Sequence, residues 1–129
     1  MVHEASDDAG AIFSALCDYY TASFTNDPVI GSRALRDLRN QKSFDPAADL
    51  FSNGAVWGAV LWKLRGEVTP EQADDIVFRW SRVLGNGKNI DARQAAESLA
   101  VVASVQSSAL GESVERELAK RGVQDLFSK

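Results

Sequence analysis

The chain has 129 residues, of which 45% are hydrophobic and 25% charged, and its formal net charge is −4. This length suffices for one domain with a single core, and the composition is typical of a globular protein rather than a disordered one. The negative charge argues against nucleic acid as a partner, since phosphate binding requires clustered lysine and arginine. No apolar run approaches the ~20 residues of a membrane-spanning helix, so we expect no membrane partner.

The N-terminus is acidic and polar, and residues 1–7 are expected to form a disordered or frayed leader. It lacks the basic start and the apolar stretch of a secretory signal, so the sequence predicts a cytoplasmic protein. Asp7 or Asp8 can cap a first helix, which ends before Pro28 because the residue preceding a proline avoids the helical region. Cys17, the single cysteine of the chain, is interpreted as an inert thiol on the buried face of this helix.

The middle of the chain is predicted to hold two main helices. Residues 31–50 are mixed and polar, with a short turn of helix expected around 33–38 and another at 46–51. Asn53 is predicted to cap a helix that ends near Gly66. A second helix follows a capping box and a proline at its first position, and three tryptophans at helical spacing are interpreted as core residues: Trp57, Trp62 and Trp80.

Two further helices complete the pattern. Asp91 opens a long helix that is expected to run to Leu110 and to end at Gly111. The last helix is predicted to begin near Glu112 and to stop at Gly122. No segment alternates apolar and polar residues convincingly enough for a strand. The sequence therefore predicts one all-α domain over residues 1–129, a compact bundle of five to six helices.

Two groups of motifs stand out. The first is Asp-Tyr-Tyr-x-Ala-Ser beginning at Asp18, followed by Asp-Pro-x-Ile-Gly beginning at Asp27. The second is Asn-Gly-x-x-Trp-Gly-x-x-Leu-Trp beginning at Asn53. In order and spacing these motifs resemble the C-terminal helical subdomain of thermolysin-like and fungalysin-like zinc metallopeptidases, and the likeness extends over roughly residues 12–126.

The resemblance implies the wall of a former substrate cleft. Asp18 is similar to the family's aspartate that orients a zinc-binding histidine, Arg36 to the arginine that contacts a substrate carbonyl, and Asn53 to the asparagine that binds a substrate amide. Each residue also has a purely structural interpretation. Asp18 and Arg36 can form a partly buried ion pair, and Asn53 can serve only as a helix cap.

The resemblance also implies that the chemistry of the family has been lost. Ser14 stands where the third zinc ligand, a glutamate, is expected, and a neutral hydroxyl is a poor zinc ligand. Phe51 stands where a histidine would stabilise the oxyanion, and its ring donates no hydrogen bond. The single histidine, His3, belongs to a His-Glu-Ala-Ser-Asp segment that ends in aspartate where the zinc motif has its second histidine. We therefore expect no catalytic residues, no metal and no cofactor.

These observations favour a non-catalytic, metallopeptidase-derived helical module that binds a protein or an extended peptide, or that associates with itself. The alternative is the helical half of a split zinc metallopeptidase whose zinc-bearing half is supplied elsewhere. A third hypothesis is a regulator, such as an inhibitor or an immunity protein. The carboxylate pair Asp74-Asp75 is interpreted as helix-start and surface charge rather than as an acid–base pair.

Overall fold

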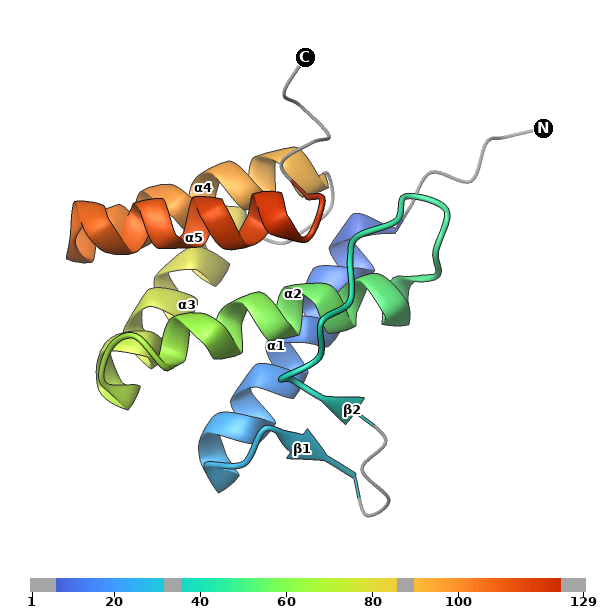
Figure 1. The fold of residues 1–129 in the computed structure, drawn as a ribbon, viewed down its shortest axis with the longest axis horizontal. Coiled ribbons are helices and arrows are strands. Elements are labelled where there is room, and N and C mark those ends of the chain that lie inside the picture. Colours follow the sequence, from blue (N-terminus) through green and yellow to red (C-terminus); the bar gives the residue numbers. More distant parts are fainter. Residues whose placement is uncertain (1–6, 32–35, 86–89, 124–129) are drawn as a thin grey trace.

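The computed structural model describes residues 7–31, 36–85 and 90–123, and this part of the chain is almost entirely helical (Figure 1). The prediction of an all-α bundle is confirmed. In chain order the elements are α1 (Asp8–Thr25), β1 (Val29–Ile30), β2 (Arg36–Asp37), α2 (Leu50–Arg65), α3 (Pro70–Leu84), α4 (Ala92–Gln106) and α5 (Ser108–Lys120). Within these described segments, no helix is long and apolar enough to span a membrane.

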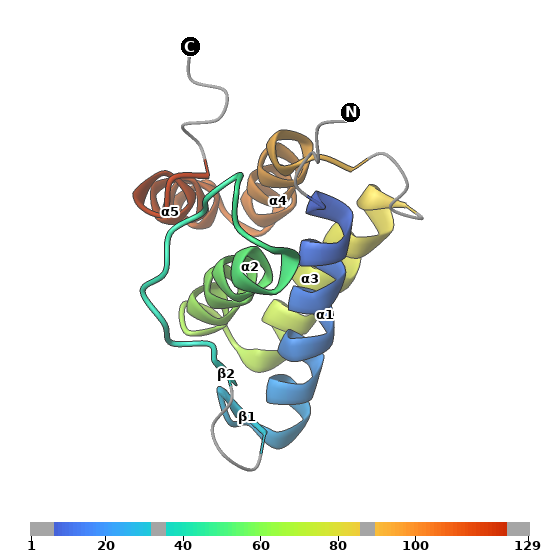
Figure 2. The same cartoon turned by 90° about the vertical axis from the view of Figure 1, so that its right-hand side faces the viewer.

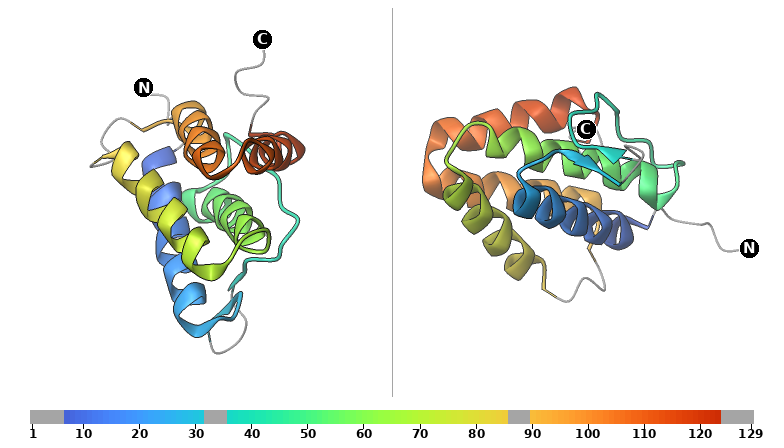
Figure 3. Two further views of the ribbon diagram at one scale, coloured as in Figure 1. Left: turned by 90° about the vertical axis from the view of Figure 1, so that its left-hand side faces the viewer. Right: turned by 90° about the horizontal axis from the view of Figure 1, so that it is seen from below.

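Helix α2 forms the centre of the bundle. Figure 2 shows it enclosed by the other helices and by the loop that leads into it from β2. All residues from Asn53 to Leu61 are buried, which is the pattern of a helix that is covered on every side. The α4–α5 pair lies over one side of α2, and α1 runs beside it on another (Figure 3).

Glycines allow two of the helix pairs to approach closely. A Cβ atom on Gly54 of α2 would lie 3.0 Å from the carbonyl oxygen of Ala11 in α1. A Cβ atom on Gly111 of α5 would lie 2.7 Å from the Cβ of Ser104 and 3.2 Å from the carbonyl oxygen of Ala100 in α4. Since backbone atoms cannot move aside as flexible side chains do, any larger residue at these two positions would push the helices apart.

Most helix starts agree with the sequence prediction. The side chain of Asp7 accepts a hydrogen bond from the Gly10 amide, so Asp7 belongs to the cap of α1 rather than to the predicted leader, whose other residues lie outside the described part of the chain. The capping box of Thr69 and Gln72 is present in front of α3. Asp91 caps α4 as predicted, by accepting from the Gln94 amide.

Two predicted helix boundaries are wrong. Helix α2 begins one turn early, because the side chain of Asp49 accepts from the Ser52 amide and takes the capping role assigned to Asn53. Helix α4 ends at Gln106, because Ser107 adopts an extended conformation and its hydroxyl caps α5. Gly111 therefore lies inside α5 and serves close packing rather than termination.

The segment between α1 and α2 also differs from the prediction. Residues 36 and 37 form an antiparallel pair with β1 instead of a turn of helix, with Ile30 opposite Arg36 and Val29 opposite Asp37. The Leu38 amide extends this pairing by donating to the carbonyl of Pro28 at 2.9 Å. Helical periodicity could not reveal the pairing, since it joins only two residues from each strand. The remainder of the predicted turn, residues 33–35, lies outside the described residues.

Candidate functional site

The candidate site centres on an ion pair between α1 and β2. The carboxylate of Asp18 accepts two hydrogen bonds from the Arg36 guanidinium, one from Nε at 2.8 Å and one from Nη2 at 3.0 Å. The Asp18 side chain is 7% exposed, whereas that of Arg36 is 44% exposed. This two-point geometry fixes the plane of the guanidinium and leaves one edge of Arg36 facing solvent. The predicted ion pair is confirmed.

The short hairpin holds Arg36 against α1. Leu38, directly after β2, is 2% exposed, and its side chain lies against Gly58 of α2. A Cβ atom added to Gly58 would be only 2.6 Å from Leu38 Cδ2. The strand is therefore anchored on α2 by an apolar contact one residue past its end. Asp37 lies between Arg36 and Leu38 in the chain. Its carboxylate accepts two hydrogen bonds from the Arg39 side chain, at 2.9 and 2.8 Å.

Asn53 lies inside α2 and supports the preceding loop. Its Nδ2 donates to the carbonyl of Asp45 at 2.8 Å, and its Oδ1 accepts from the Asp45 amide at 3.1 Å. The side chain is 2% exposed. Asn53 therefore has a structural role in this chain, although the role is not the helix cap that its position suggested.

Ser14 and Phe51 lie on facing helices but in different surroundings. Ser14 of α1 sits at the crossing with α2, where its Cβ and Oγ lie 3.2 Å from the position of a Cβ atom on Gly54. Phe51 of α2 is 65% exposed. Neither residue fits a zinc ion, since Ser14 offers only a neutral hydroxyl and Phe51 offers no donor atom. Within the described residues, no three His, Cys, Asp or Glu side chains are grouped to hold a metal ion, and His3 lies outside those residues.

An aromatic surface that was not anticipated runs along α1. We call it the outer stripe, and it consists of Phe13, Cys17, Tyr20 and Phe24, which follow at spacings of four, three and four residues. Phe13 is 69% exposed, Tyr20 40% and Phe24 92%. Cys17 is also exposed, so its predicted burial is wrong. The buried face of α1 is formed instead by three alanines together with Ile12, Asp18 and Tyr19.

A polar cluster joins α1, α2 and α3. Asp74 accepts hydrogen bonds from Tyr19 Oη at 2.7 Å, from Ser23 Oγ at 2.9 Å and from Arg65 Nη1 at 3.1 Å. The Arg65 guanidinium also lies 5.3 Å from the ring centroid of Trp62. Asp74 is therefore more than the surface charge that its sequence suggested. No sequence signal could identify this role, because its partners are up to 55 residues away.

The polar cluster predicts a loss of stability at alkaline pH. Burial, followed by the hydrogen bond to Asp74, raises the pKa of Tyr19 above its ordinary value near 10. Because the folded state holds this proton more tightly than the unfolded state, the Tyr19 contribution is complete below pH ~10 and is lost as the pH rises further. We expect the free energy of unfolding, measured in urea, to fall as the pH rises above about 10.

Tyr19→Phe should make this decline shallower, although its stability at pH 8 should be lower because a hydrogen bond is lost. Part of the decline should persist, since burial also raises the pKa of Tyr20. An equal slope in Tyr19→Phe and in the unmodified protein would contradict this assignment.

A buried ion pair fixes the loop in front of α2 to the end of α5. Arg121 Nε donates to Glu117 at 2.6 Å, and each side chain is 6% exposed. The other guanidinium nitrogens of Arg121 donate to the carbonyls of Asn40 at 2.8 Å and Lys42 at 2.9 Å. The Phe44 amide completes the contact by donating to the Arg121 carbonyl at 2.7 Å. The C-terminal end of α5 thus determines the path of the chain between β2 and α2.

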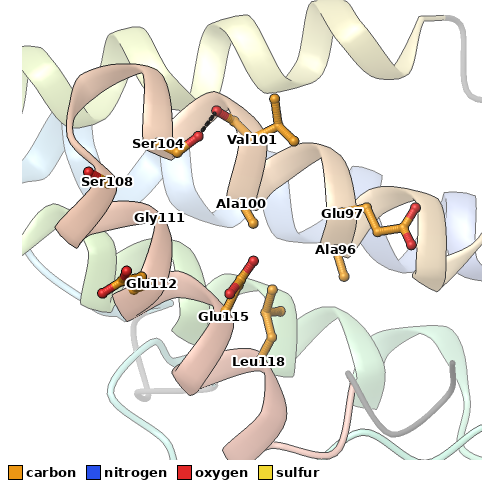
Figure 4. Close-up of a pocket in the computed structure, with 10 residues that line it drawn as sticks. All are labelled: Ala96, Glu97, Ala100, Val101, Ser104, Ser108, Gly111, Glu112, Glu115 and Leu118. Atoms are coloured by element: carbon orange, nitrogen blue, oxygen red, sulfur yellow. Dashed lines mark hydrogen bonds between the residues drawn. The ribbon is translucent and has the colours of Figure 1, made fainter. Parts of the chain in front are cut away.

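A hollow of about 470 Å³ lies between α4 and α5. Figure 4 shows Ala96 and Ala100 at its floor, with Glu97 on α4 and Glu112 and Glu115 on α5 around it. Among the described residues that line it are these three glutamates and no lysine or arginine. The hollow would therefore repel an anionic ligand, in keeping with the negative net charge of the chain.

Taken together, the predicted residues divide into two groups. Asp18 and Arg36 form the bidentate ion pair between α1 and β2, whereas Asn53, Ser14 and Phe51 are not brought to that pair by any hydrogen bond of the described residues. Comparisons of the chain with models of known protein families, with curated proteins and with solved structures find no match.

Proposed function

We propose that this chain is a non-catalytic helical module, derived from a zinc metallopeptidase, that binds an extended segment of a partner protein. The observation that carries the proposal is the outer stripe of α1, in which Phe13 and Phe24 are 69% and 92% exposed. Aromatic side chains gathered on one exposed helix face are typical of a protein-binding surface, since covering them removes apolar area from water.

Arg36 supplies a polar anchor that Asp18 holds against α1. Cys17 of the stripe precedes Asp18 in the chain, and Asp18 holds Arg36 through Nε and Nη2. We assign the remaining nitrogen, Nη1, to a backbone carbonyl of the partner segment. A segment that crosses α1 at this point would cover the aromatic rings and reach the guanidinium at the same time. This arrangement agrees with the carbonyl-binding role that the resemblance implies for Arg36.

The lost chemistry supports binding without catalysis. Ser14 and Phe51 provide neither a zinc ligand nor a donor for an oxyanion, and both belong to this chain. In a split peptidase the zinc-bearing half would come from a second chain, yet these two positions would still be substituted. Zinc bound stoichiometrically at α1, measured by elemental analysis of the purified protein, would favour the split-peptidase alternative over the proposal.

Peptide selection tests the proposal directly. Random dodecapeptides displayed on phage are selected on the immobilised chain, and a selected peptide is synthesised with a fluorescent label for polarisation measurements. We expect Arg36→Ala to weaken binding of that peptide by roughly 1.5–3 kcal/mol, the scale of a hydrogen bond to a charged group. Phe24→Ser should also weaken it, because the peptide would cover a ring that is 92% exposed.

Arg39→Ala is the matched control. Arg39 lies three residues after Arg36 and is exposed, but its guanidinium pairs with Asp37 on the other side of the hairpin, so its removal should leave the affinity unchanged. Thermal unfolding of each variant is needed, since Arg36→Ala leaves the buried Asp18 without its partner. Phe24→Ser removes no buried contact and keeps the test decisive. Selected peptides that bind Arg36→Ala and Phe24→Ser as tightly as they bind the unmodified chain would overturn the proposal.

A further inference from the structure

Asn40, in the loop after β2, uses every hydrogen-bonding site of its side chain. Its Nδ2 donates to the carbonyl of Asp37 at 2.9 Å and to that of Ala55 in α2 at 3.2 Å. Its Oδ1 accepts from the Lys42 amide at 3.0 Å and from Arg121 Nη1 at 3.4 Å. An asparagine side chain offers two donor hydrogens and two acceptor lone pairs, and here all four have partners. This half-buried side chain therefore joins the hairpin, α2 and the end of α5.

The bond to Asp37 fixes the peptide group that follows β2. The carbonyl of Asp37 and the amide of Leu38 belong to one planar peptide group. The carbonyl accepts from Asn40 Nδ2, and the amide donates to the carbonyl of Pro28 at 2.9 Å. The group is thus bonded on both sides. Because it begins one residue after Arg36, these two bonds limit the movement of the backbone that carries the Arg36 side chain.

Arg121 holds Asn40 from the direction of α5. Its Nη2 donates to the Asn40 carbonyl at 2.8 Å, while its Nη1 contacts the Oδ1 of the same residue. Arg121 is itself fixed by the buried ion pair with Glu117. Asn40 therefore cannot shift without breaking contacts with α5. The Arg36 side chain is held at both ends, its guanidinium by Asp18 and its backbone through Asn40.

We propose that Asn40 is a positioning residue for Arg36: it sets the backbone of β2 so that the guanidinium stays on Asp18 with Nη1 available to the partner segment. This inference rests on the proposed function, in which Nη1 binds a carbonyl of that segment. Asn40 acts through Arg36 and does not touch the segment. Its contribution to affinity is pre-organisation, since a group already held in its binding geometry loses less freedom on binding.

Hydrogen exchange measured by nuclear magnetic resonance tests the structural step. Asn40→Asp keeps the size and the oxygen acceptors of the side chain but removes both donors, so the Asp37 carbonyl loses its bond to Nδ2. We expect the Leu38 amide and the Nε proton of Arg36 to exchange with solvent roughly five-fold faster or more, the scale of one lost hydrogen bond. Gln41→Glu is the matched control, because it changes an amide to a carboxylate at the next residue, which is exposed. It should leave both exchange rates unchanged.

Binding of the selected peptide tests the functional step. Asn40→Asp should weaken the affinity for that peptide by roughly three-fold or more, because Arg36 is then less well pre-organised. Adding Asn40→Asp to Arg36→Ala should cause no further loss, whereas a direct contact between Asn40 and the peptide would make the two losses add. Ser107→Ala removes the cap at the opposite end of α5. It should lower the melting temperature but change neither the exchange rates nor the affinity.

Unchanged exchange at the Leu38 amide and at Arg36 Nε in Asn40→Asp would overturn the proposal. So would faster exchange without a loss of peptide affinity, or losses that add in the double variant. If Arg36→Ala binds the peptide as tightly as the unmodified chain does, the proposed function fails instead. The exchange rates would still decide whether Asn40 fixes the backbone at Arg36, so the two proposals can fail separately.

Discussion

Replacing Arg121 by alanine is expected to lower the free energy of unfolding by about 3–5 kcal/mol, the scale measured when one partner of a buried ion pair is removed. Glu117 and Arg121 are both buried, so the variant would leave a buried carboxylate without its cation. The same change removes the hydrogen bonds to the carbonyls of Asn40 and Lys42. Urea denaturation followed by circular dichroism measures the difference.

Arg79→Ala provides the comparison. Arg79 forms an ion pair with Asp75 at the same spacing of four residues along a helix, at 2.9 Å, but both side chains are more than half exposed. Exposed pairs of this kind contribute little, so the expected change is within about 0.5 kcal/mol. If Arg121→Ala and Arg79→Ala lowered the free energy of unfolding equally, the Glu117–Arg121 pair would not be what fixes the loop before α2.

Replacing Trp80 by alanine should also cost about 3–5 kcal/mol, the range for removing a large aromatic side chain from a core. Trp80 is fully buried, and its ring lies 5.6 Å from that of Trp57 between the centroids. Its Nε1 donates to the carbonyl of Ala95 at 3.0 Å, which ties α3 to α4. The melting temperature and the urea midpoint of the variant should therefore both decrease.

Phenylalanine variants separate the contribution of the indole hydrogen bond to stability from that of the side-chain volume. Among the described residues, Trp57 Nε1 has no hydrogen-bond partner, although this atom is buried. Trp57→Phe thus removes an unpaired donor, whereas Trp80→Phe removes a satisfied one. We expect Trp80→Phe to be the more destabilising of the two by about 1 kcal/mol. The reverse order would indicate that Trp57 has a partner, such as a buried water molecule.

The sequence predicted those parts of the fold that depend on neighbouring residues. Asp7, the Thr69–Gln72 capping box and Asp91 were identified as helix starts because a cap and its amide partner lie three residues apart. The all-α class followed from the same local periodicity. The pairing of Asp18 with Arg36 was also anticipated, although it came from a family resemblance and from opposite charge rather than from spacing.

The errors concern residues whose partners lie beyond the three- or four-residue spacing of a helical turn. Asn53 has the chemistry of a cap, but it was displaced from that role by Asp49 and bonds instead to the backbone of Asp45. Gly111 has the chemistry of a helix stop, yet its function is to let α5 approach Ser104. In both cases a contact in the folded structure gave the residue a role other than the helix cap or helix stop that its chemistry suggested.

Cys17 was expected in the core and lies instead on the outside of α1, between Phe13 and Phe24 in the outer stripe. Because the chain has a single cysteine, a thiol-reactive, environment-sensitive dye would attach at one defined point without any engineered residue. The fluorophore would sit on the same helix face as the two phenyl rings. A change in its emission would then report the binding of a partner segment to the outer stripe.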